Sequence, residues 1–319
     1  MVSAGIADAL ARDSQVSIWR HRPDWPTGIR SLAPVLRALA ASLHPPDFIL
    51  FTHVDLARMM LVVPFLRKVP YGVLIYGVEV WRPLDRWRRA SLERAATILA
   101  ISDYTVRKAR ESNPWLPDAQ IVWLGAAERR ARERQQTKPI VLVLGRMASS
   151  ERYKGHDALI DAWPRVVSAV PEAQLLVVGD GDDRARLEAR AAGTRSITFT
   201  GFIPEASREA LLDSSTVLVS ISTGEGFGLA AVEAASSGVP VVALRGTVTE
   251  ELFPGGCGHV LLDSAEPESL AEALIALLTD TERARAIGAA GMRRVREVFT
   301  IDHFNQRLRA AIAPLSSAQ

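Results

Sequence analysis

Two glutamates, Glu225 and Glu233, stand eight residues apart across a glycine-rich segment. The segment follows an apolar run at residues 217–221, which is typical of a buried parallel strand. Glycines let the backbone approach a ligand closely, and the free N–H groups that open the next helix can hold an anion such as a diphosphate. A carboxylate that accepts hydrogen bonds from two neighbouring hydroxyls grips a ribose or a hexose. The spacing therefore predicts a nucleotide-sugar site, with Glu225 on a loop and Glu233 about one turn into a helix.

Two cations, Arg146 and Lys154, follow a second apolar run at residues 140–144. Cations at the carboxyl end of a strand can neutralise the charge that develops on a departing diphosphate, and two of them could replace a metal ion. Both side chains could equally be surface cations of a loop. No metal site is expected, because the lone Cys257 and the remaining histidines lack metal-ligand spacing. Those histidines are His21, His44, His156, His259 and His303.

Five stretches of the second half, in the same order along the chain, resemble the donor domain of the GT4 family of retaining glycosyltransferases. They are Gly145-Arg146 with Lys154-Gly155, residues 177–181, residues 199–204, Glu225 to Glu233, and residues 238–242. The resemblance implies an α/β protein of GT-B fold, with two Rossmann-like doubly wound parallel-sheet domains facing across a cleft. It also implies an enzyme that moves a hexose, with retention, from a UDP- or GDP-sugar to an acceptor. That acceptor would be a surface saccharide, a lipid-linked sugar or a small molecule, and no cofactor is implied.

The same resemblance assigns roles to single residues. Arg146 and Lys154 match the pair that binds the diphosphate without a metal. Glu225 matches the residue that faces the donor sugar, and Glu233 the one that holds the ribose hydroxyls. The other donor-binding residues that it implies are Gly145, Gly201, Phe202, Ile203, Gly226, Phe227, Gly228 and Leu229. Two alternatives stay open, since Glu233 could be a solvent-facing helix residue and Phe202 a core side chain.

In the first half, residues 71–81 resemble the family's strand that ends in His-Gly, a histidine that lies near the donor sugar. Tyr76 stands at the histidine position here, three residues before Glu79. A tyrosine hydroxyl can still donate a hydrogen bond to a sugar oxygen. Ser102 matches a Ser-x-x-Thr turn after the next strand, or else is a helix cap without a ligand. His53 follows a further strand, and the candidates for the cleft are therefore His53, Tyr76, Glu79 and Ser102.

Alternating strand and helix patterns predict three segments: a domain over residues 1–137, a donor domain over 138–298, and a helix over 299–319 that returns toward the first domain. Strands are expected at 48–51, 72–76, 98–101, 140–144, 174–178, 197–200, 217–220 and 239–243. A polar linker is expected at 128–138. The family's first strand and its glycine turn have no counterpart, since the chain begins in or before a helix near residues 6–18. Either the chain is a fragment or begins at a wrong start, or the protein has lost part of the floor of its active site. The first domain is therefore expected to be the less stable half, and donor binding to exceed turnover.

The composition is that of a globular protein, with 48% hydrophobic and 23% charged residues in 319. A single cysteine, with neither a signal peptide nor a long uncharged apolar run, predicts a cytoplasmic protein. Residues 1–137 carry 20 Lys and Arg against 13 Asp and Glu, and the rest 18 against 23. The basic half could meet a phosphate-bearing acceptor or an anionic membrane, or be a solvated face.

Tryptophans and arginines are interspersed at residues 81–89. This stretch could lie at the inner membrane face or hold a lipid diphosphate. It could also form a surface helix whose tryptophans point inward. No nucleic-acid-binding pattern occurs.

Two rival functions remain. An epimerase would need acids or histidines placed for proton abstraction, which the sequence does not offer. A catalytically weak nucleotide-sugar-binding subunit would fit Tyr76 and the shortened beginning.

Overall fold

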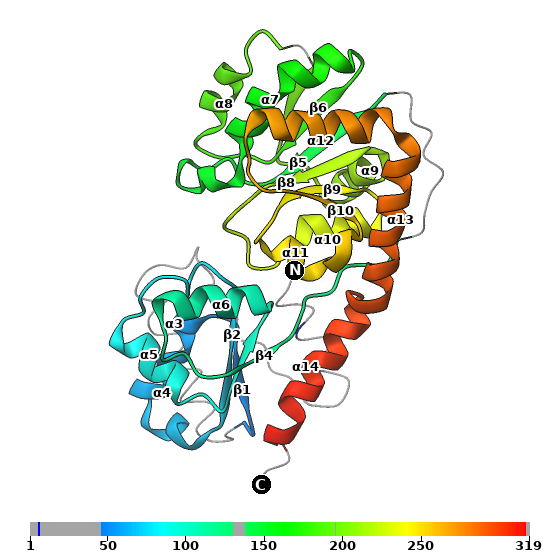
Figure 1. The fold of residues 1–319 in the computed structure, drawn as a ribbon. Coiled ribbons are helices and arrows are strands. Elements are labelled where there is room, and N and C mark those ends of the chain that lie inside the picture. Colours follow the sequence, from blue (N-terminus) through cyan, green and yellow to red (C-terminus); the bar gives the residue numbers. More distant parts are fainter. Residues whose placement is uncertain (1–5, 7–45, 130–137, 195, 317–319) are drawn as a thin grey trace. The chain divides into compact units, whose positions relative to one another are not determined.

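The computed structural model describes Ile6 and residues 46–129, 138–194 and 196–316, which divide into two compact units (Figure 1). The first unit runs to Leu124 and takes in the chain from Ile301 onwards, whereas the second spans Gly125–Thr300. The second unit thus begins earlier than the predicted residue 138. The reason is local packing, because Arg129 forms ion pairs of 3.0 Å with both Glu209 and Asp213. The predicted helix at 6–18 and most of the predicted linker lie outside the described residues.

The first unit has a four-stranded parallel sheet in the order β1-β2-β3-β4 among its described residues. Apolar side chains of β1 to β3 pack against α3, α5 and α6 in one buried cluster. The elements are β1 (Ile49–Phe51), α3 (Val54–Ala57), α4 (Met59–Val62), η1 (Pro64–Lys68), β2 (Tyr71–Ile75), α5 (Arg86–Glu93), β3 (Thr97–Ala100), α6 (Asp103–Ser112), β4 (Ala119–Ile121) and α14 (Ile301–Ser316).

The second unit has a six-stranded parallel sheet in the order β10-β9-β8-β5-β6-β7. Its strands are β5 (Ile140–Leu144), β6 (Gln174–Val178), β7 (Ile197–Gly201), β8 (Val217–Ser220), β9 (Val241–Leu244) and β10 (His259–Leu262). Its helices are η2 (Ser149–Lys154), α7 (His156–Ala169), α8 (Arg184–Arg190), α9 (Glu205–Ser214), α10 (Leu229–Ser236), α11 (Val248–Leu252), η3 (Pro254–Gly256), α12 (Pro267–Thr279) and α13 (Thr281–Val298).

Helices cover both faces of this second sheet. Alternate strand residues such as Val143 and Val219 join α7, α8 and α12 in one buried cluster. The residues between them, such as Leu142 and Leu218, are fully buried but outside that cluster, on the face of α9 and α10. The chain runs outward from β5 through β6 to β7, then returns to β8 beside β5 and continues to β10. The sheet is therefore doubly wound, and its order reverses between β5 and β8.

The strands predicted from apolar runs are confirmed to within two residues, and both sheets are parallel as expected. Two strands were not predicted. β4 is short and at most half-buried, and β10 begins with a histidine, so neither presents a continuous apolar run.

Candidate functional site

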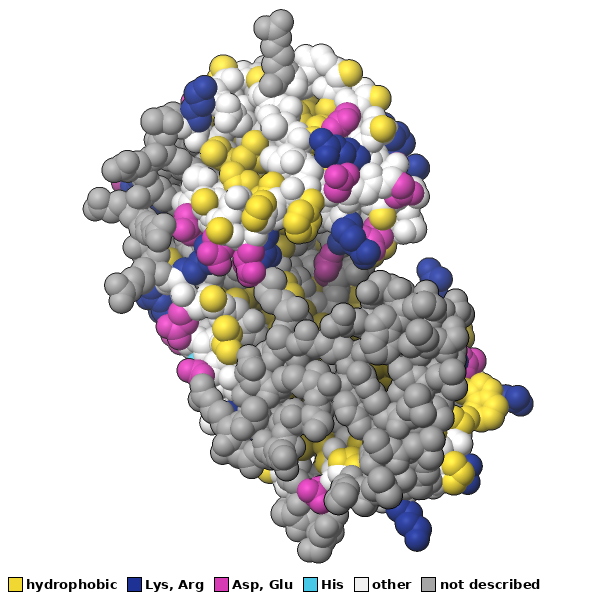
Figure 2. All heavy atoms as spheres, turned by 180° about the vertical axis from the view of Figure 1, so that it is seen from behind, with side chains coloured by type: hydrophobic (Ala, Val, Ile, Leu, Met, Phe, Trp, Pro, Cys, Tyr) yellow, Lys and Arg dark blue, Asp and Glu magenta, His cyan; other side chains and the backbone are white. Residues whose placement is uncertain are grey.

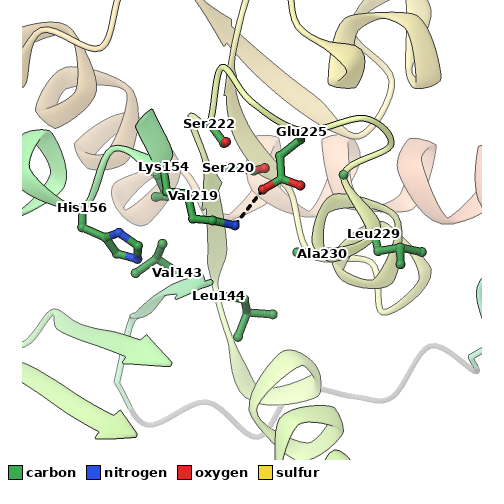
Figure 3. A pocket seen from close by; sticks show the side chains of 11 residues that line it. Val143, Leu144, Lys154, His156, Val219, Ser220, Ser222, Glu225, Leu229 and Ala230 are labelled. Atoms are coloured by element: carbon green, nitrogen blue, oxygen red, sulfur yellow. Dashed lines mark hydrogen bonds and ion pairs between the residues drawn. The ribbon is translucent and has the colours of Figure 1, made fainter. Parts of the chain in front are cut away.

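A pocket of about 180 Å³ lies at the carboxyl ends of β5 and β8 (Figure 3). These are the strands between which the sheet order reverses, and open parallel sheets bind ligands at such a switch point. The lining residues are Val143, Leu144, Lys154, His156, Val219, Ser220, Ser222, Glu225, Gly228, Leu229 and Ala230. Four of these residues were assigned to the donor site from the sequence: Lys154, Glu225, Gly228 and Leu229.

Lys154 and Glu225 meet inside this pocket although 71 residues separate them. The ammonium of Lys154 lies 3.0 Å from Glu225 Oε1, and only 16% of the lysine side chain is exposed. Lys154 ends η2, where Gly155 adopts a left-handed conformation with φ of +80° and turns the chain into α7. The predicted diphosphate-binding cation and the predicted sugar-facing carboxylate thus form one ion pair.

Arg146 is held by a carboxylate that the sequence did not predict. Its guanidinium pairs with Glu151, which also lies 3.7 Å from the ammonium of Lys154. Arg146 is 75% exposed, whereas Glu151 is only 15% exposed. Both predicted cations are therefore balanced by carboxylates of the protein itself, and an incoming diphosphate would compete with Glu151 and Glu225 for them.

A close contact joins the loop of Lys154 to the loop of Glu225. The ring of Tyr153 lies directly over Gly224, so that a Cβ at this glycine would be 2.3 Å from Tyr153 Cε2. In addition, the N–H of Thr223 donates to the carbonyl of Tyr153 over 3.3 Å. Because a Cβ at position 224 would overlap the Tyr153 ring, the close approach of these two loops requires a glycine there.

His156 opens α7 and lines the pocket, a role that its sequence spacing did not reveal. It is 5% exposed, and its Nε2 is buried without a hydrogen-bond partner in the part of the chain that the structure describes. Burial, and after it the charge of Lys154, lower the pKa of the imidazole below its ordinary value. The ring is therefore neutral at pH 7 and offers one hydrogen bond at Nε2.

The start of α10 closes the pocket with backbone groups. Gly228 precedes the helix with φ of +70°, and no side chain caps the first turn. Gly228, Leu229 and Ala230 line the pocket, and the first N–H groups of a helix can bind an anion. Gly226 lies in the loop before the helix and is not among the residues that line the pocket. Phe227 instead points inward, 3% exposed, with its ring 5.9 Å from that of Phe299.

Glu233 lies one turn into α10 and pairs with an arginine rather than facing solvent. Arg208 Nη1 on α9 is 2.6 Å from its Oε2, and 16% of the Glu233 side chain is exposed. Burial raises the pKa of this carboxyl, against the opposing charge of Arg208. The open alternative of a solvent-facing glutamate is thereby excluded, although the arginine partner was not predicted.

The segment after β7 presents an exposed aromatic ring. Phe202 is 86% exposed, so the alternative of a core phenylalanine is wrong. It follows Gly201, whose φ is +70°, and precedes the half-buried Ile203. Gly145, directly after β5, lies close to Lys154, since a Cβ at this glycine would be 3.3 Å from Lys154 Cδ.

The first-unit candidates follow three neighbouring parallel strands, β1, β2 and β3. His53 caps α3, with its Nδ1 accepting from Asp55 N at 3.1 Å. Tyr76 donates its backbone N–H to Glu79 Oε1 over 2.5 Å, and burial raises the pKa of its hydroxyl. Ser102 is fully buried and caps α6 by accepting from Thr105 N at 3.0 Å. Each of these polar groups already stabilises local structure.

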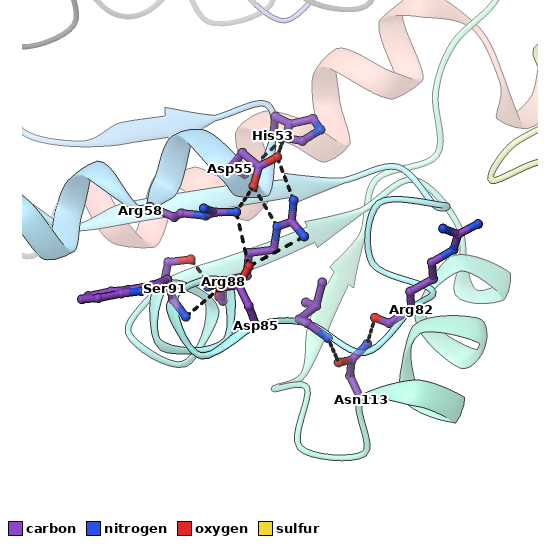
Figure 4. Close-up of polar contacts among 10 residues, drawn as sticks. His53, Asp55, Arg58, Arg82, Asp85, Arg88, Ser91 and Asn113 are labelled. Carbon is purple, nitrogen blue, oxygen red and sulfur yellow. Dashed lines mark hydrogen bonds and ion pairs between the residues drawn. The ribbon is translucent and has the colours of Figure 1, made fainter. Parts of the chain in front are cut away.

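The tryptophan- and arginine-rich stretch at 81–89 divides between interior and surface. Trp81 donates to the carbonyl of Thr105 over 3.3 Å and packs edge-on against Tyr104, whereas Trp87 is 47% exposed. Arg88 donates to both oxygens of Asp55, over 2.7 and 3.1 Å (Figure 4). This ion-pair cluster ties α5 to α3.

Within the described residues, no group of three or more His, Cys, Asp or Glu side chains is placed to hold a metal ion. No helix in the same ranges is both long and apolar enough to cross a bilayer.

Comparison with known proteins begins with a family model described as glycosyl transferases group 1, which matches residues 138–280. A GDP-mannose-dependent alpha-(1-6)-phosphatidylinositol monomannoside mannosyltransferase of Mycolicibacterium smegmatis is 32% identical over 287 residues. The match covers 80% of this chain and 72% of that protein. The chain belongs to the group 1 glycosyltransferases.

Another relative matches a smaller part of the chain. A phosphatidyl-myo-inositol mannosyltransferase of Mycobacterium leprae is 38% identical over 160 residues, or 48% of this glycosyltransferase chain and 42% of its own length. The chain thus spans less than half of that relative. Sucrose-phosphate synthase of Thermosynechococcus elongatus has the same GT-B fold, with a TM-score of 0.80, 20% identity, and coverage of 98% of this chain and 92% of that one.

Proposed function

We propose that this group 1 glycosyltransferase moves a mannosyl group from GDP-mannose to an acceptor built on phosphatidylinositol. The donor and the acceptor are those of the mannosyltransferase of Mycolicibacterium smegmatis, of which this chain covers 72%. GDP-mannose lies within the wider choice of UDP- or GDP-sugars that the sequence left open. A lipid-linked acceptor likewise narrows the earlier range of saccharide, lipid-linked and small-molecule acceptors.

One observation carries the donor site. A lysine, a histidine whose Nε2 has no partner among the described residues, and a helix start that none of their side chains caps lie together in one pocket at the switch point. A diphosphate there would be neutralised by Lys154 and bound by the first N–H groups of α10. Glu233, after exchanging Arg208 for two hydroxyls, would hold the ribose. The exposed ring of Phe202 offers a face on which a nucleobase can stack.

In the transfer step, the bond between the sugar C1 and the diphosphate oxygen breaks, and the acceptor oxygen bonds to C1 on the same face. The departing diphosphate takes the acceptor proton, so that no side chain has to act as a base. Arg146 and Lys154 neutralise the charge on the leaving group, which makes a divalent metal unnecessary. For this they must exchange Glu151 and Glu225 for phosphate oxygens.

The experiment is a GDP-release assay with GDP-mannose, phosphatidylinositol vesicles and EDTA, followed by lipid chromatography. We expect GDP and a mannosylated lipid, with UDP-glucose inactive. Lys154→Gln should abolish GDP release, whereas the exposed Lys138→Gln should leave it unchanged. If the protein binds GDP-mannose but releases no GDP with any acceptor present, the alternative of a catalytically weak nucleotide-sugar-binding subunit is favoured. A requirement for added metal would contradict the role of the two cations.

A further inference from the structure

A second pocket of the protein, of about 410 Å³, lies in the first unit, at the end of the strands opposite to His53, Tyr76 and Ser102. It surrounds Tyr71, the first residue of β2, whereas those three residues follow the carboxyl ends of strands. Three cations line it: Arg67, Lys68 and Arg94. No acidic residue is among the described residues that form its wall.

Two local features place the cations. Arg67 and Lys68 end η1, and Arg94 is the C-cap of α5, where the partial negative charge of a helix end favours a cation. Arg67 Nη2 donates to the carbonyl of Leu61 over 3.0 Å, which fixes its guanidinium and leaves other N–H groups to the pocket. The three positive charges therefore come from two elements, η1 and α5, and line one pocket.

The floor of the pocket carries no compensating negative charge. Tyr71 is 5% exposed and donates its hydroxyl to the carbonyl of Ser91 over 2.6 Å. Burial raises the pKa of this hydroxyl to about 12, so that it stays protonated at neutral pH. Met60 and Val69 complete the floor with apolar side chains.

Other arginines of the first unit form ion pairs with nearby carboxylates. Arg88 lies 2.7 Å from Asp55, and Arg89 lies 2.8 Å from Glu93. Arg67, Lys68 and Arg94 form no ion pair within the described ranges, although Glu93 immediately precedes Arg94 on α5. Three positive charges around an apolar floor favour the binding of an anion.

We propose that this pocket binds the phosphate group of a phosphate-bearing ligand. Guanidinium groups match phosphate oxygens with paired N–H donors, and an ammonium adds a point charge. The volume exceeds that of a phosphate alone, which leaves room for the alcohol to which the phosphate is esterified. A phospholipid headgroup and a soluble phosphate ester share this chemistry. The proposal is independent of the donor pocket, because it concerns the other unit.

The test compares Lys68→Gln/Arg94→Gln with a matched control, Arg107→Gln/Lys108→Gln. Both variants remove two positive charges from the first unit, and the control lies on α6, where the ion pairs of Arg107 and Lys108 are exposed and contribute little to stability. One arm measures sedimentation with vesicles of equal parts phosphatidylcholine and phosphatidylglycerol. The other arm titrates inositol 1-phosphate by calorimetry, with GDP present to fill the donor pocket.

We expect the protein and the control variant to bind alike in at least one arm, and the pocket variant about tenfold or more weakly. Binding to vesicles alone identifies a lipid headgroup as the source, and binding of inositol 1-phosphate alone identifies a soluble ester. The proposal is overturned if the unsubstituted protein binds in neither arm, or if both variants lose affinity equally. Should the double variant melt early, Lys68→Gln carries the comparison, since this ammonium makes no hydrogen bond in the described part.

Discussion

Glu233 contributes to a donor site only if its carboxylate can leave Arg208 for ribose hydroxyls. Hydrogen bonds to a charged group are worth about 1.5–3 kcal/mol each. Glu233→Gln should therefore weaken GDP binding about tenfold or more in a calorimetric titration. The control is Glu205→Gln, because Glu205 also contacts Arg208, at 3.6 Å, but is 61% exposed. Equal affinities of both variants for GDP would mean that Glu233 serves only to fix Arg208.

His156 should make the stability of the protein depend on pH. Its pKa is depressed in the folded state, so that below about pH 6.5 the unfolded chain takes up a proton that the folded protein resists. The free energy of unfolding should therefore fall between about pH 6.5 and pH 5 and stay level above that range. Urea unfolding at several pH values measures this.

His156→Gln should reduce the slope of that fall without removing it, because burial also lowers the pKa of His259. The control, His53→Gln, replaces a histidine of the other unit whose side chain is 44% exposed. An unchanged slope in His156→Gln would show that this imidazole can be protonated in the folded protein without cost.

At the scale of elements, the Tyr153 ring lies so close to Gly224 that it leaves little room for a side chain there, and a substitution can test this. Gly224→Ala would place a Cβ 2.3 Å from the Tyr153 ring, and overpacking of this kind costs about 1–3 kcal/mol. We expect a lower melting temperature and weaker GDP binding, because the loop of Lys154 must move. Adding Tyr153→Ala should restore much of the loss. Additive effects of the two substitutions would refute the steric account.

Elements were predictable where burial is continuous. The run at 140–144 is apolar along its whole length, the run at 217–220 is apolar up to Ser220, and both are strands with those bounds. The Glu225 turn and the helix carrying Glu233 followed from glycine spacing. In contrast, Arg208, Glu151 and the exposure of Phe202 depend on which elements pack together, and no local pattern encodes that. His156 was passed over because its importance lies in burial, which only the tertiary structure supplies.

At the scale of the whole molecule, the two units have separate hydrophobic cores. GDP should therefore stabilise the second unit alone, by about 1.4 kcal/mol for each tenfold excess over its dissociation constant. In native-state hydrogen exchange, GDP should slow the amides of β5 and β8 but not those of β2 and β3. Without GDP, the four-stranded sheet should exchange faster than the six-stranded one. Equal protection of all four strands by GDP would show that the units unfold as one.

Phe299 contacts none of the proposed ligands, but it contacts residues of several segments of the second unit. It is fully buried and packs against Phe227 of the Glu225 turn and against Phe253, while its carbonyl accepts from Ala126 where the chain enters the second unit. Arg294 covers the same ring at 5.4 Å. Among natural variants of this protein, changes at position 299 should thus be as rare as changes in the pocket. A survey of harmful substitutions limited to ligand contacts would overlook that position.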